Sequence, residues 1–225
     1  TGLAVVSELL DRGEKVTAMV RETSDTRALD ALGVEQVVAD AMNPDQVRAA
    51  IPEGAYAAVV SALATSPRDM PARKNFLQTL LTGPVRMDPD KRPDFVGNRN
   101  VIDAAKAAGV KRFLLLTVIG AGNSADAVPL PARNATSDIA PVKDKAENYL
   151  RESGLDYTII RPGWLGNVAA TGTAILTEDP RSFSYIARED LAKLIVLALG
   201  DDRTVGRTYS AYDPARRYLW ELYID

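Results

Sequence analysis

The side chains able to do chemistry in this chain are hydroxyls, lysines, arginines and carboxylates, because it contains no histidine and no cysteine. Hydrolases of the Ser-His-Asp kind need a histidine base, and zinc sites built from thiolates or imidazoles need the same two missing residue types. These classes are therefore excluded, and we expect no metal site. Any reaction must depend on the remaining polar groups or on a bound cofactor.

Polar or glycine-containing segments directly follow several apolar runs that have the length of buried strands. In an open parallel sheet, ligands bind beyond the carboxyl ends of the strands, so these segments are where a site is expected. The residues concerned are Arg21, Asp40, Ser61, Ala62, Leu63, Thr117, Pro162, Gly163, Trp164 and Leu165.

The elements that must position these residues alternate along the chain. Apolar residues recur at helical spacing from residue 3 to 10, and further helices are expected at 26–32, 43–51, 95–108, 142–153 and 191–199. Strands are expected at 15–20, 34–40, 57–62, 112–117 and 157–160, with a final strand after Gly206. This alternation predicts an α/β fold with a Rossmann-type, doubly wound parallel sheet between two helical layers.

Arg21 ends the strand that follows the first helix, which is where such a fold contacts the ribose of an adenosine. A carboxylate there would hydrogen-bond a ribose 2′-hydroxyl, whereas a guanidinium suits a 2′-phosphate through paired, charge-assisted bonds. Arg21 therefore favours NADP over NAD, and Arg27 could assist. The alternative interpretation is a solvated arginine at a strand end.

Thr1 and Gly2 stand directly before the first helical pattern. They fit the last two residues of a Gly-rich phosphate loop, in which Gly2 lets the helix approach its strand and backbone amides face a pyrophosphate. A chain that opens inside a helical pattern indicates that the first strand and most of this loop are absent from it. We therefore expect a sheet that lacks a central member and exposes unpaired edges.

The length of 225 residues fits one domain of this type, spanning 1–225. The segment 65–93 is irregular and rich in proline, so it is expected to be an insertion at the carboxyl edge of the sheet, with one short helix at 74–81. Segments 121–140 and 164–225 are expected to form the substrate side. We find no internal repeat and no low-complexity segment.

Composition limits the partners. With 27 Lys and Arg against 30 Asp and Glu, the net charge of -3 provides no basic field for a nucleic acid. No apolar run approaches the roughly 20 residues that cross a bilayer, and no signal peptide opens the chain, so we expect no membrane span and a cytoplasmic location. A monomer, a homodimer and a subunit of a larger assembly all stay open.

Two segments, taken together and in this order, carry a family resemblance. They are residues 94–113, DFVGNRNVIDAAKAAGVKRF, and residues 153–163, SGLDYTIIRPG. With them the chain resembles the atypical short-chain dehydrogenase/reductases of the NmrA-like, NAD(P)-binding group over nearly its whole length. In that family the fold begins with a strand and a Gly-rich turn ending in Thr-Gly, which matches the position of Thr1 and Gly2.

The resemblance implies a set of cofactor contacts. Asp40 and Ala41 would border the adenine, and Ser61 to Leu63 would line the adenosine ribose and the pyrophosphate. Pro162 to Leu165 would cover the nicotinamide.

The resemblance also implies two active-site positions. Thr117 corresponds to the family's strand-end serine, and Lys143 to the lysine that holds the nicotinamide ribose and lowers the pKa of a tyrosine four residues earlier. That tyrosine protonates the substrate oxygen, but here its position is Ile139, which cannot transfer a proton. Thr117, Ser137, Asp138 or a water could supply one, and no spacing selects among them.

Simpler structural roles stand beside these assignments. Lys143 could belong to a charged, solvated helix face, and Thr117 could cap a turn through its hydroxyl. Pro162 and Gly163 could merely end a strand, since proline cannot donate to the ladder, and Trp164 could fill core.

Three functions fit these residues and their spacing. The first is an NADP-dependent oxidoreductase that moves a hydride to or from a small carbonyl, enone or quinone-like substrate. The second is an NADP(H)-binding redox sensor or scaffold subunit without turnover, which Ile139 favours. An epimerase or dehydratase is the third, and is disfavoured because its chemistry also calls on the missing tyrosine.

Overall fold

The computed structural model describes residues 1–65, 88–129, 136 and 138–216, and every structural statement below concerns these residues. The helices are α1 (Gly2–Asp11), α2 (Arg27–Ala31), α3 (Pro44–Ala50), α5 (Asn98–Ala107), α7 (Ala140–Arg151) and α8 (Arg188–Leu199). The strands are β1 (Thr17–Val20), β2 (Glu35–Val38), β3 (Ala58–Ser61), β4 (Arg112–Leu116), β5 (Asp156–Pro162), β6 (Trp164–Gly166), β7 (Ile175–Thr177), β8 (Tyr185–Ala187) and β9 (Arg207–Tyr212).

The predicted alternation of helices and strands is confirmed, and local chemistry explains where elements begin and end. The side chain of Asn43 accepts hydrogen bonds from the backbone amides of Asp45 and Gln46, which starts α3 at Pro44. Gly109 and Gly154, which follow the C-terminal ends of α5 and α7, have φ values of 74° and 82°, a left-handed conformation that favours glycine.

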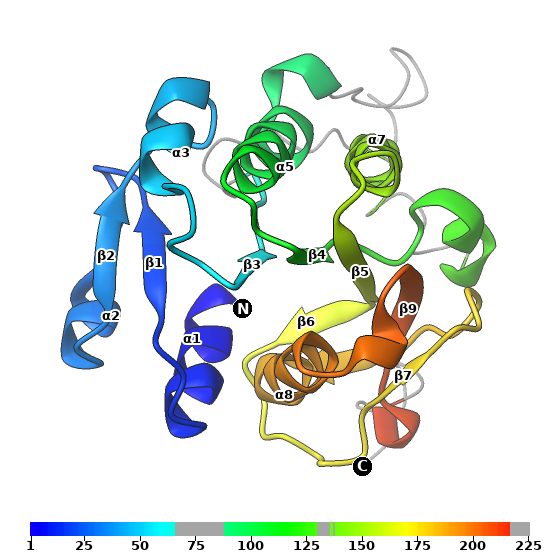
Figure 1. Cartoon of the computed structure of the whole chain (residues 1–225). Coiled ribbons are helices and arrows are strands. Elements are labelled where there is room, and N and C mark those ends of the chain that lie inside the picture. The colour runs from blue at the N-terminus through cyan, green and yellow to red at the C-terminus, as the bar shows by residue number, and fades with distance from the viewer. Residues whose placement is uncertain (66–87, 130–135, 137, 217–225) are drawn as a thin grey trace.

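The strands form a mostly parallel arrangement in three sheets. β3, β4, β5 and β9 are parallel neighbours in that order, and β7 joins the edge of β9 in the antiparallel sense. β1 and β2 form a separate parallel pair, and β6 and β8 form another. The sheet is therefore not continuous, because no described strand lies between β1 and β3, where Figure 1 shows the N terminus.

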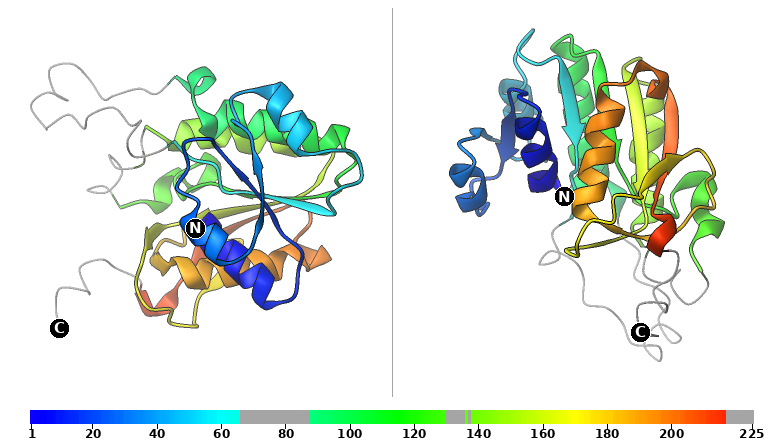
Figure 2. Two further views of the ribbon diagram at one scale, coloured as in Figure 1. Left: turned by 90° about the vertical axis from the view of Figure 1, so that its left-hand side faces the viewer. Right: turned by 90° about the horizontal axis from the view of Figure 1, so that it is seen from below.

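Helices cover both faces of the five-stranded sheet, as Figures 1 and 2 show. α3, α5 and α7 lie on one face and α8, with α1 beside it, on the other. Strand alternation divides the core accordingly: Phe113 and Leu115 join the cluster under α5 and α7, whereas Leu114 and Leu116 join the cluster under α8. All four side chains are buried.

Some element boundaries differ from the predicted ones. β5 continues through Pro162, although proline was expected to end the strand earlier, because this last position needs only a carbonyl: Pro162 accepts from the amide of Ile119 at 2.8 Å. α7 begins two residues early, at Ala140, and a π-helical turn, η2 (Pro93–Gly97), precedes α5.

The segment after β5 contains three short strands, β6, β7 and β8, that the sequence pattern did not indicate. The predicted insertion at 65–93 lies largely outside the described residues, as do the short helix expected at 74–81 and the end of the chain beyond residue 216. None of the described helices has the length and apolar character needed to span a membrane.

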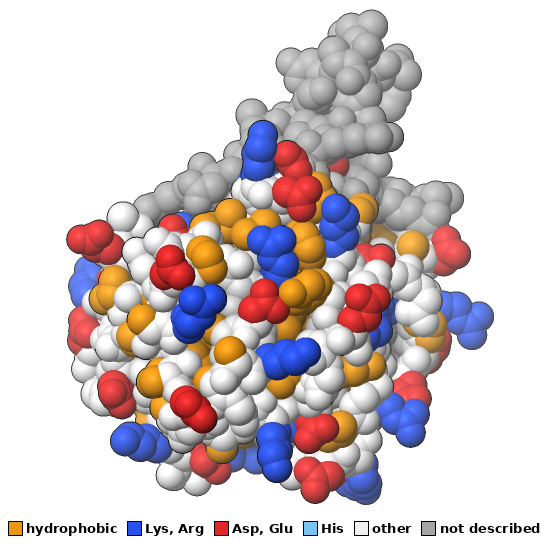
Figure 3. Space-filling view, turned by 45° about the horizontal axis from the view of Figure 1, so that its top comes forward, with side chains coloured by type: hydrophobic (Ala, Val, Ile, Leu, Met, Phe, Trp, Pro, Cys, Tyr) orange, Lys and Arg blue, Asp and Glu red, His pale blue; other side chains and the backbone are white. Residues whose placement is uncertain are grey.

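The outer face formed by α3, α5 and α7 mixes basic, acidic and apolar side chains (Figure 3). Phe95 lies within 5.8 Å of the Arg99 guanidinium and 5.5 Å of the Lys145 ammonium, and meets the ring of Tyr149 edge-on. Long cationic side chains thus cover part of the aromatic surface between α5 and α7.

Candidate functional site

The residues singled out from the sequence occupy one edge of the fold. β1 to β5 run parallel within their sheets, and Arg21, Thr117 and Gly163 come directly after the strands β1, β4 and β5. Gly2, the first residue of α1, begins its helix on the side at which these strands end (Figure 2). The predicted site is therefore built from strand ends, as open parallel sheets favour.

The adenosine side of the predicted site is solvent-exposed. Arg21 and Asp40 are both exposed, and the Asp40 carboxylate accepts from the amide of Met42 at 2.9 Å. Arg27, the suggested helper, is bound to Asp25 at 2.6 Å, and its hydrogen bonds hold the pKa of Asp25 below the usual value. An open hollow lined by Asp25 and Arg27 lies beside this loop.

Ala41 and Ser61 make hydrogen bonds that join the ends of the strands to α5. Ala41 is buried, and its carbonyl accepts from Asn100 at 2.8 Å. Ser61 is also buried, and its hydroxyl donates to the side chain of Asn98 at 2.6 Å. The Ser61 hydroxyl is therefore already occupied by a partner within the protein. Ala62 and Leu63, which follow, are half-buried.

Lys143 is the best-defined polar group at this edge. Its side chain is only 6% exposed, so it does not belong to a solvated helix face. The ammonium donates to the carbonyl of Leu63 and forms an ion pair with Asp94 at 2.8 Å. An ammonium has three N–H donors, and among the described residues the Leu63 carbonyl is the one hydrogen-bond acceptor found for it, so donors remain for a ligand.

Asp94 was not among the predicted site residues, although it opens the first segment that carried the family resemblance. It is fully buried, and it accepts from the backbone amide of Thr65 at 2.8 Å and from the Thr65 hydroxyl. Periodicity identified a helix here but gave no reason to expect a carboxylate inside the protein, because aspartate is rarely fully buried without a partner. The partner, Lys143, lies on a different helix.

Thr117 belongs to a second buried cluster, formed by Glu147, Arg161, Arg151 and Thr117, which we call the Glu147 cluster. Arg161 donates to both carboxylate oxygens of Glu147, at 2.9 and 2.6 Å, and Arg151 donates at 2.8 Å. The Thr117 hydroxyl donates to Glu147 at 2.8 Å. The hydroxyl proton of Thr117 is therefore directed into the protein. To donate it to a substrate, Thr117 would first have to break its hydrogen bond to Glu147.

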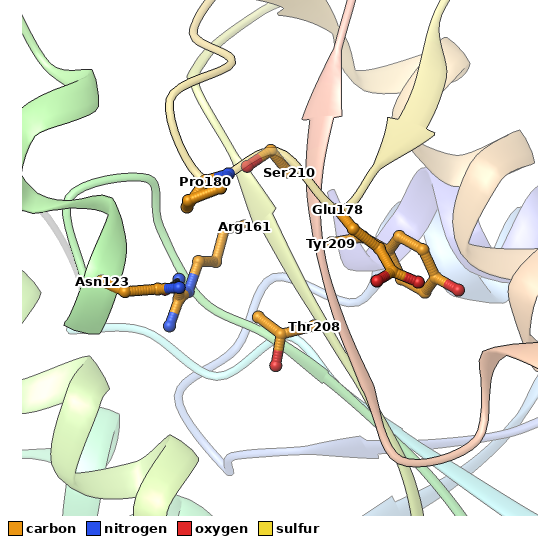
Figure 4. Close-up of a pocket in the computed structure, with 7 residues that line it drawn as sticks. All are labelled: Asn123, Arg161, Glu178, Pro180, Thr208, Tyr209 and Ser210. Atoms are coloured by element: carbon orange, nitrogen blue, oxygen red, sulfur yellow. Dashed lines mark hydrogen bonds between the residues drawn. The ribbon is translucent and has the colours of Figure 1, made fainter.

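The Glu147 cluster borders a small polar pocket, shown in Figure 4. Arg161 points toward Asn123 and donates to its side-chain oxygen at 2.5 Å, with Thr208 nearby. The pocket has a volume of about 20 Å³, enough for about one water and far below that of a ligand site. We therefore treat it as part of the structural framework.

The segment from Pro162 to Leu165, expected to cover a nicotinamide, makes a close backbone crossing. A Cβ atom on Gly163 would lie 2.0 Å from the carbonyl oxygen of Ser184, so only glycine fits there. Trp164 and Leu165 follow in β6 and are half-buried, and the Trp164 ring meets Phe183 edge-on at 5.5 Å. Packing thus fixes the position of the segment that was expected to cover a nicotinamide.

Ile139 lies at the N-terminal boundary of α7, and its carbonyl accepts from the amide of Lys143 at 3.0 Å. The two residues are therefore one helical turn apart, as the sequence spacing predicted. The position that would carry a proton-donating tyrosine is occupied by an aliphatic side chain.

Residues 1–202 match the family model described as NAD(P)H-binding. This chain belongs to that family. The predicted resemblance to atypical, NAD(P)-binding short-chain reductases is confirmed, and so is the α/β class of the fold.

The relatives include both enzymes with assigned names and uncharacterized ones. The chain is 30% identical over 209 residues to the uncharacterized sugar epimerase YhfK of Bacillus subtilis, covering 92% of this chain and 87% of that protein. It is 30% identical over 224 residues to sanguinarine reductase of Eschscholzia californica, covering 88% and 80%. The solved structure of ChuY, an anaerobillin reductase from Escherichia coli O157:H7, aligns with a TM-score of 0.74 at 27% identity, covering 95% and 91%.

Proposed function

We propose that this protein is an NADP-dependent reductase that transfers a hydride to a small carbonyl, enone or quinone-like substrate. The observation that carries the proposal is the buried ammonium of Lys143, fixed at the carboxyl edge of the sheet by Asp94 and the Leu63 carbonyl. The two named reductases among the relatives support the reaction class.

The residues of the chain fit the dinucleotide that the family binds. An N–H of Lys143 that does not bind the Leu63 carbonyl would donate to a hydroxyl of the nicotinamide ribose, and the backbone from Ser61 to Leu63 would line the pyrophosphate. Arg21 would pair with a 2′-phosphate, which favours NADP over NAD. When bound, the cofactor supplies the hydride.

The chain's own contribution is orientation of the reacting groups. The segment from Pro162 to Leu165 would contact one face of the nicotinamide ring. Its position is fixed because Gly163 packs directly against the backbone of Ser184. Ile139 contributes no proton, so the substrate oxygen would receive its proton from solvent. This favours substrates whose reduced form is already a stable anion, such as enones and quinones.

An NADPH oxidation assay with a dicarbonyl, an enone and a quinone tests the proposal. We expect turnover with at least one of them, and a loss of about tenfold or more in kcat/KM for Lys143→Gln, because a hydrogen bond from a charged donor is lost. The matched control is Lys193→Gln, whose ammonium lies on the exposed face of α8 beside Glu189. Binding of NADPH without oxidation by any substrate would contradict the reductase assignment.

That contradicting outcome would favour a second function, a redox sensor or scaffold that binds NADP(H) without turnover. The observation in its favour is Ile139 at the place of the usual acid. Under this second function, Ile139→Tyr should create NADPH oxidation with a dicarbonyl, because the lysine one turn later is already in place.

A further inference from the structure

Asp94 is a buried carboxylate whose two oxygens serve different partners. One oxygen accepts from the amide and the hydroxyl of Thr65, and the other faces the Lys143 ammonium at 2.8 Å. Both charged side chains are almost entirely excluded from water, with exposures of 0% for Asp94 and 6% for Lys143. Such a pair persists only when each charge is compensated by the other and by further hydrogen bonds.

The backbone that carries Asp94 is fixed from several sides. Asp94 lies in the π-helical turn η2, and its carbonyl accepts from Asn98 at 2.8 Å. Asn98 in turn accepts from Ser61, at the end of β3, at 2.6 Å. π-Helical turns of this kind often occur at functional sites, because they shift a side chain out of the helical register.

Gly97 lets this turn lie close to the end of β2. A Cβ atom on Gly97 would stand 3.1 Å from the Cβ of Ala41 and 3.5 Å from the side chain of Leu63. The turn that carries Asp94 is therefore packed against two of the segments that line the proposed cofactor groove. Its carboxylate is held at a fixed place relative to that groove.

From this arrangement we propose that Asp94 is a positioning residue that fixes the Lys143 ammonium against the nicotinamide ribose. The inference rests on the function proposed above. A lysine has a flexible four-carbon stem, so one carbonyl contact alone would not define where its ammonium lies. The hydrogen bond to the Leu63 carbonyl and the ion pair with Asp94 together hold the ammonium in one place, with donors left for the ribose.

Binding of two ligands separates this role from a purely structural one. NADPH contains the nicotinamide ribose, whereas adenosine 2′,5′-bisphosphate contains only the adenosine with its 2′- and 5′-phosphates. In Asp94→Asn we expect the Kd for NADPH to rise about tenfold or more, while the Kd for the bisphosphate stays unchanged. Equal weakening of both ligands, or of neither, would overturn the proposal.

A double-mutant cycle with Lys143→Gln makes the test independent of stability. If Asp94 acts through Lys143, Asp94→Asn should have no further effect on the NADPH Kd in the Lys143→Gln background. The double variant removes both charges, so it should fold even if Asp94→Asn alone does not. A further tenfold loss in the double variant relative to Lys143→Gln would contradict the inference.

The control is Asp103→Asn on α5, where an exposed carboxylate accepts from Tyr149. It should leave both dissociation constants unchanged. Failure of the wild-type protein to bind NADPH or NADH would instead refute the proposed function itself. The two failures are therefore distinguishable in one set of titrations.

Discussion

Glu147 is fully buried and receives hydrogen bonds from Arg161, Arg151 and Thr117 at 2.6 to 2.9 Å. One carboxylate thus neutralises a guanidinium that is itself 3% exposed and supports a second one at the helix surface. It also receives the hydroxyl of a residue that the sequence placed in the active site. This arrangement gives Thr117 a structural role, and its participation in catalysis stays a prediction.

Glu147→Gln should therefore destabilise the protein by about 3 kcal/mol, because it leaves a buried guanidinium without its counter-charge. Urea unfolding followed by circular dichroism measures the change. Glu189→Gln on α8 is the matched control, since that exposed carboxylate pairs with Lys193 at 3.3 Å and should contribute under about 1 kcal/mol. Equal free energies of unfolding for the two variants would show that Glu147 does not make the buried interactions with Arg161, Arg151 and Thr117.

Sequence reasoning found Lys143 but neither of the carboxylates near it. Lys143 was identified because the family resemblance implies the active-site lysine at this position, one turn into a predicted helix. Asp94 and Glu147 are not marked by spacing, since burial of a carboxylate depends on partners supplied by other elements. Glu147 lies one turn after Lys143 and is completely buried, although the alternative of a charged, solvated face for this helix would have exposed it.

At the scale of secondary-structure elements, the connection between β5 and β6 depends on one glycine, Gly163, which lies against the backbone of Ser184. Gly163→Ala would place a methyl group 2.0 Å from the Ser184 carbonyl oxygen, and the atoms in the way belong to the Ser184 backbone, which cannot move aside as a flexible side chain could. We expect a loss of about 3 kcal/mol in the free energy of unfolding. Gly200→Ala is the control: a Cβ there meets nothing within 4 Å and φ is -90°. An unchanged free energy of unfolding in Gly163→Ala would show that the backbone at Gly163 can move away from Ser184 without cost.

A second prediction concerns α5 and α7, which are joined by the Tyr149 hydroxyl donating to Asp103 at 2.7 Å. This hydrogen bond, and secondarily burial, raises the pKa of Tyr149 above its ordinary value of about 10. The folded state thus keeps this proton at a pH where the unfolded chain has lost it. The stabilisation is fully present below about pH 10 and is lost as pH rises through the folded pKa.

Tyr149→Phe should accordingly cost about 1 kcal/mol or less at pH 8, and the difference from wild type should shrink above pH 10. Unfolding curves of both proteins at pH 8 and pH 11 provide the measurement. Phenolate absorbance reports the titration directly. A difference that is the same at both pH values would contradict the hydrogen bond's contribution.

Regular elements were predictable where hydrophobic periodicity is strong, and irregular ones were not. The buried strand β4 and the helix α5 emerged from apolar pattern and a glycine end within a few residues of their observed bounds. The π-helical turn before α5 and the short strands β6, β7 and β8 did not. Three-residue strands are too short to show a period, and they form because distant segments pair with them.

Over the molecule as a whole, two helical layers enclose a mostly parallel sheet and leave its carboxyl edge to carry the site. The sequence predicted this class because alternating strands and helices permit few other arrangements. Among the described strands, β1 and β2 pair with each other in a sheet separate from the one that contains β3. The antiparallel pairing of β7 with β9 was not predicted, since tertiary contacts decide which strands pair.

The carboxyl edge of the sheet is proposed to bind NADP(H), with Arg21 recognising the 2′-phosphate. The most direct test is a titration of the protein with NADPH and separately with NADH, following nicotinamide fluorescence. We expect NADPH to bind more tightly than NADH, and Arg21→Ala to weaken NADPH by about tenfold or more while leaving NADH unchanged. Arg203→Ala, an exposed arginine paired with Asp201, is the control. Binding of neither dinucleotide would contradict the proposed function and leave a Rossmann-type fold without its cofactor role.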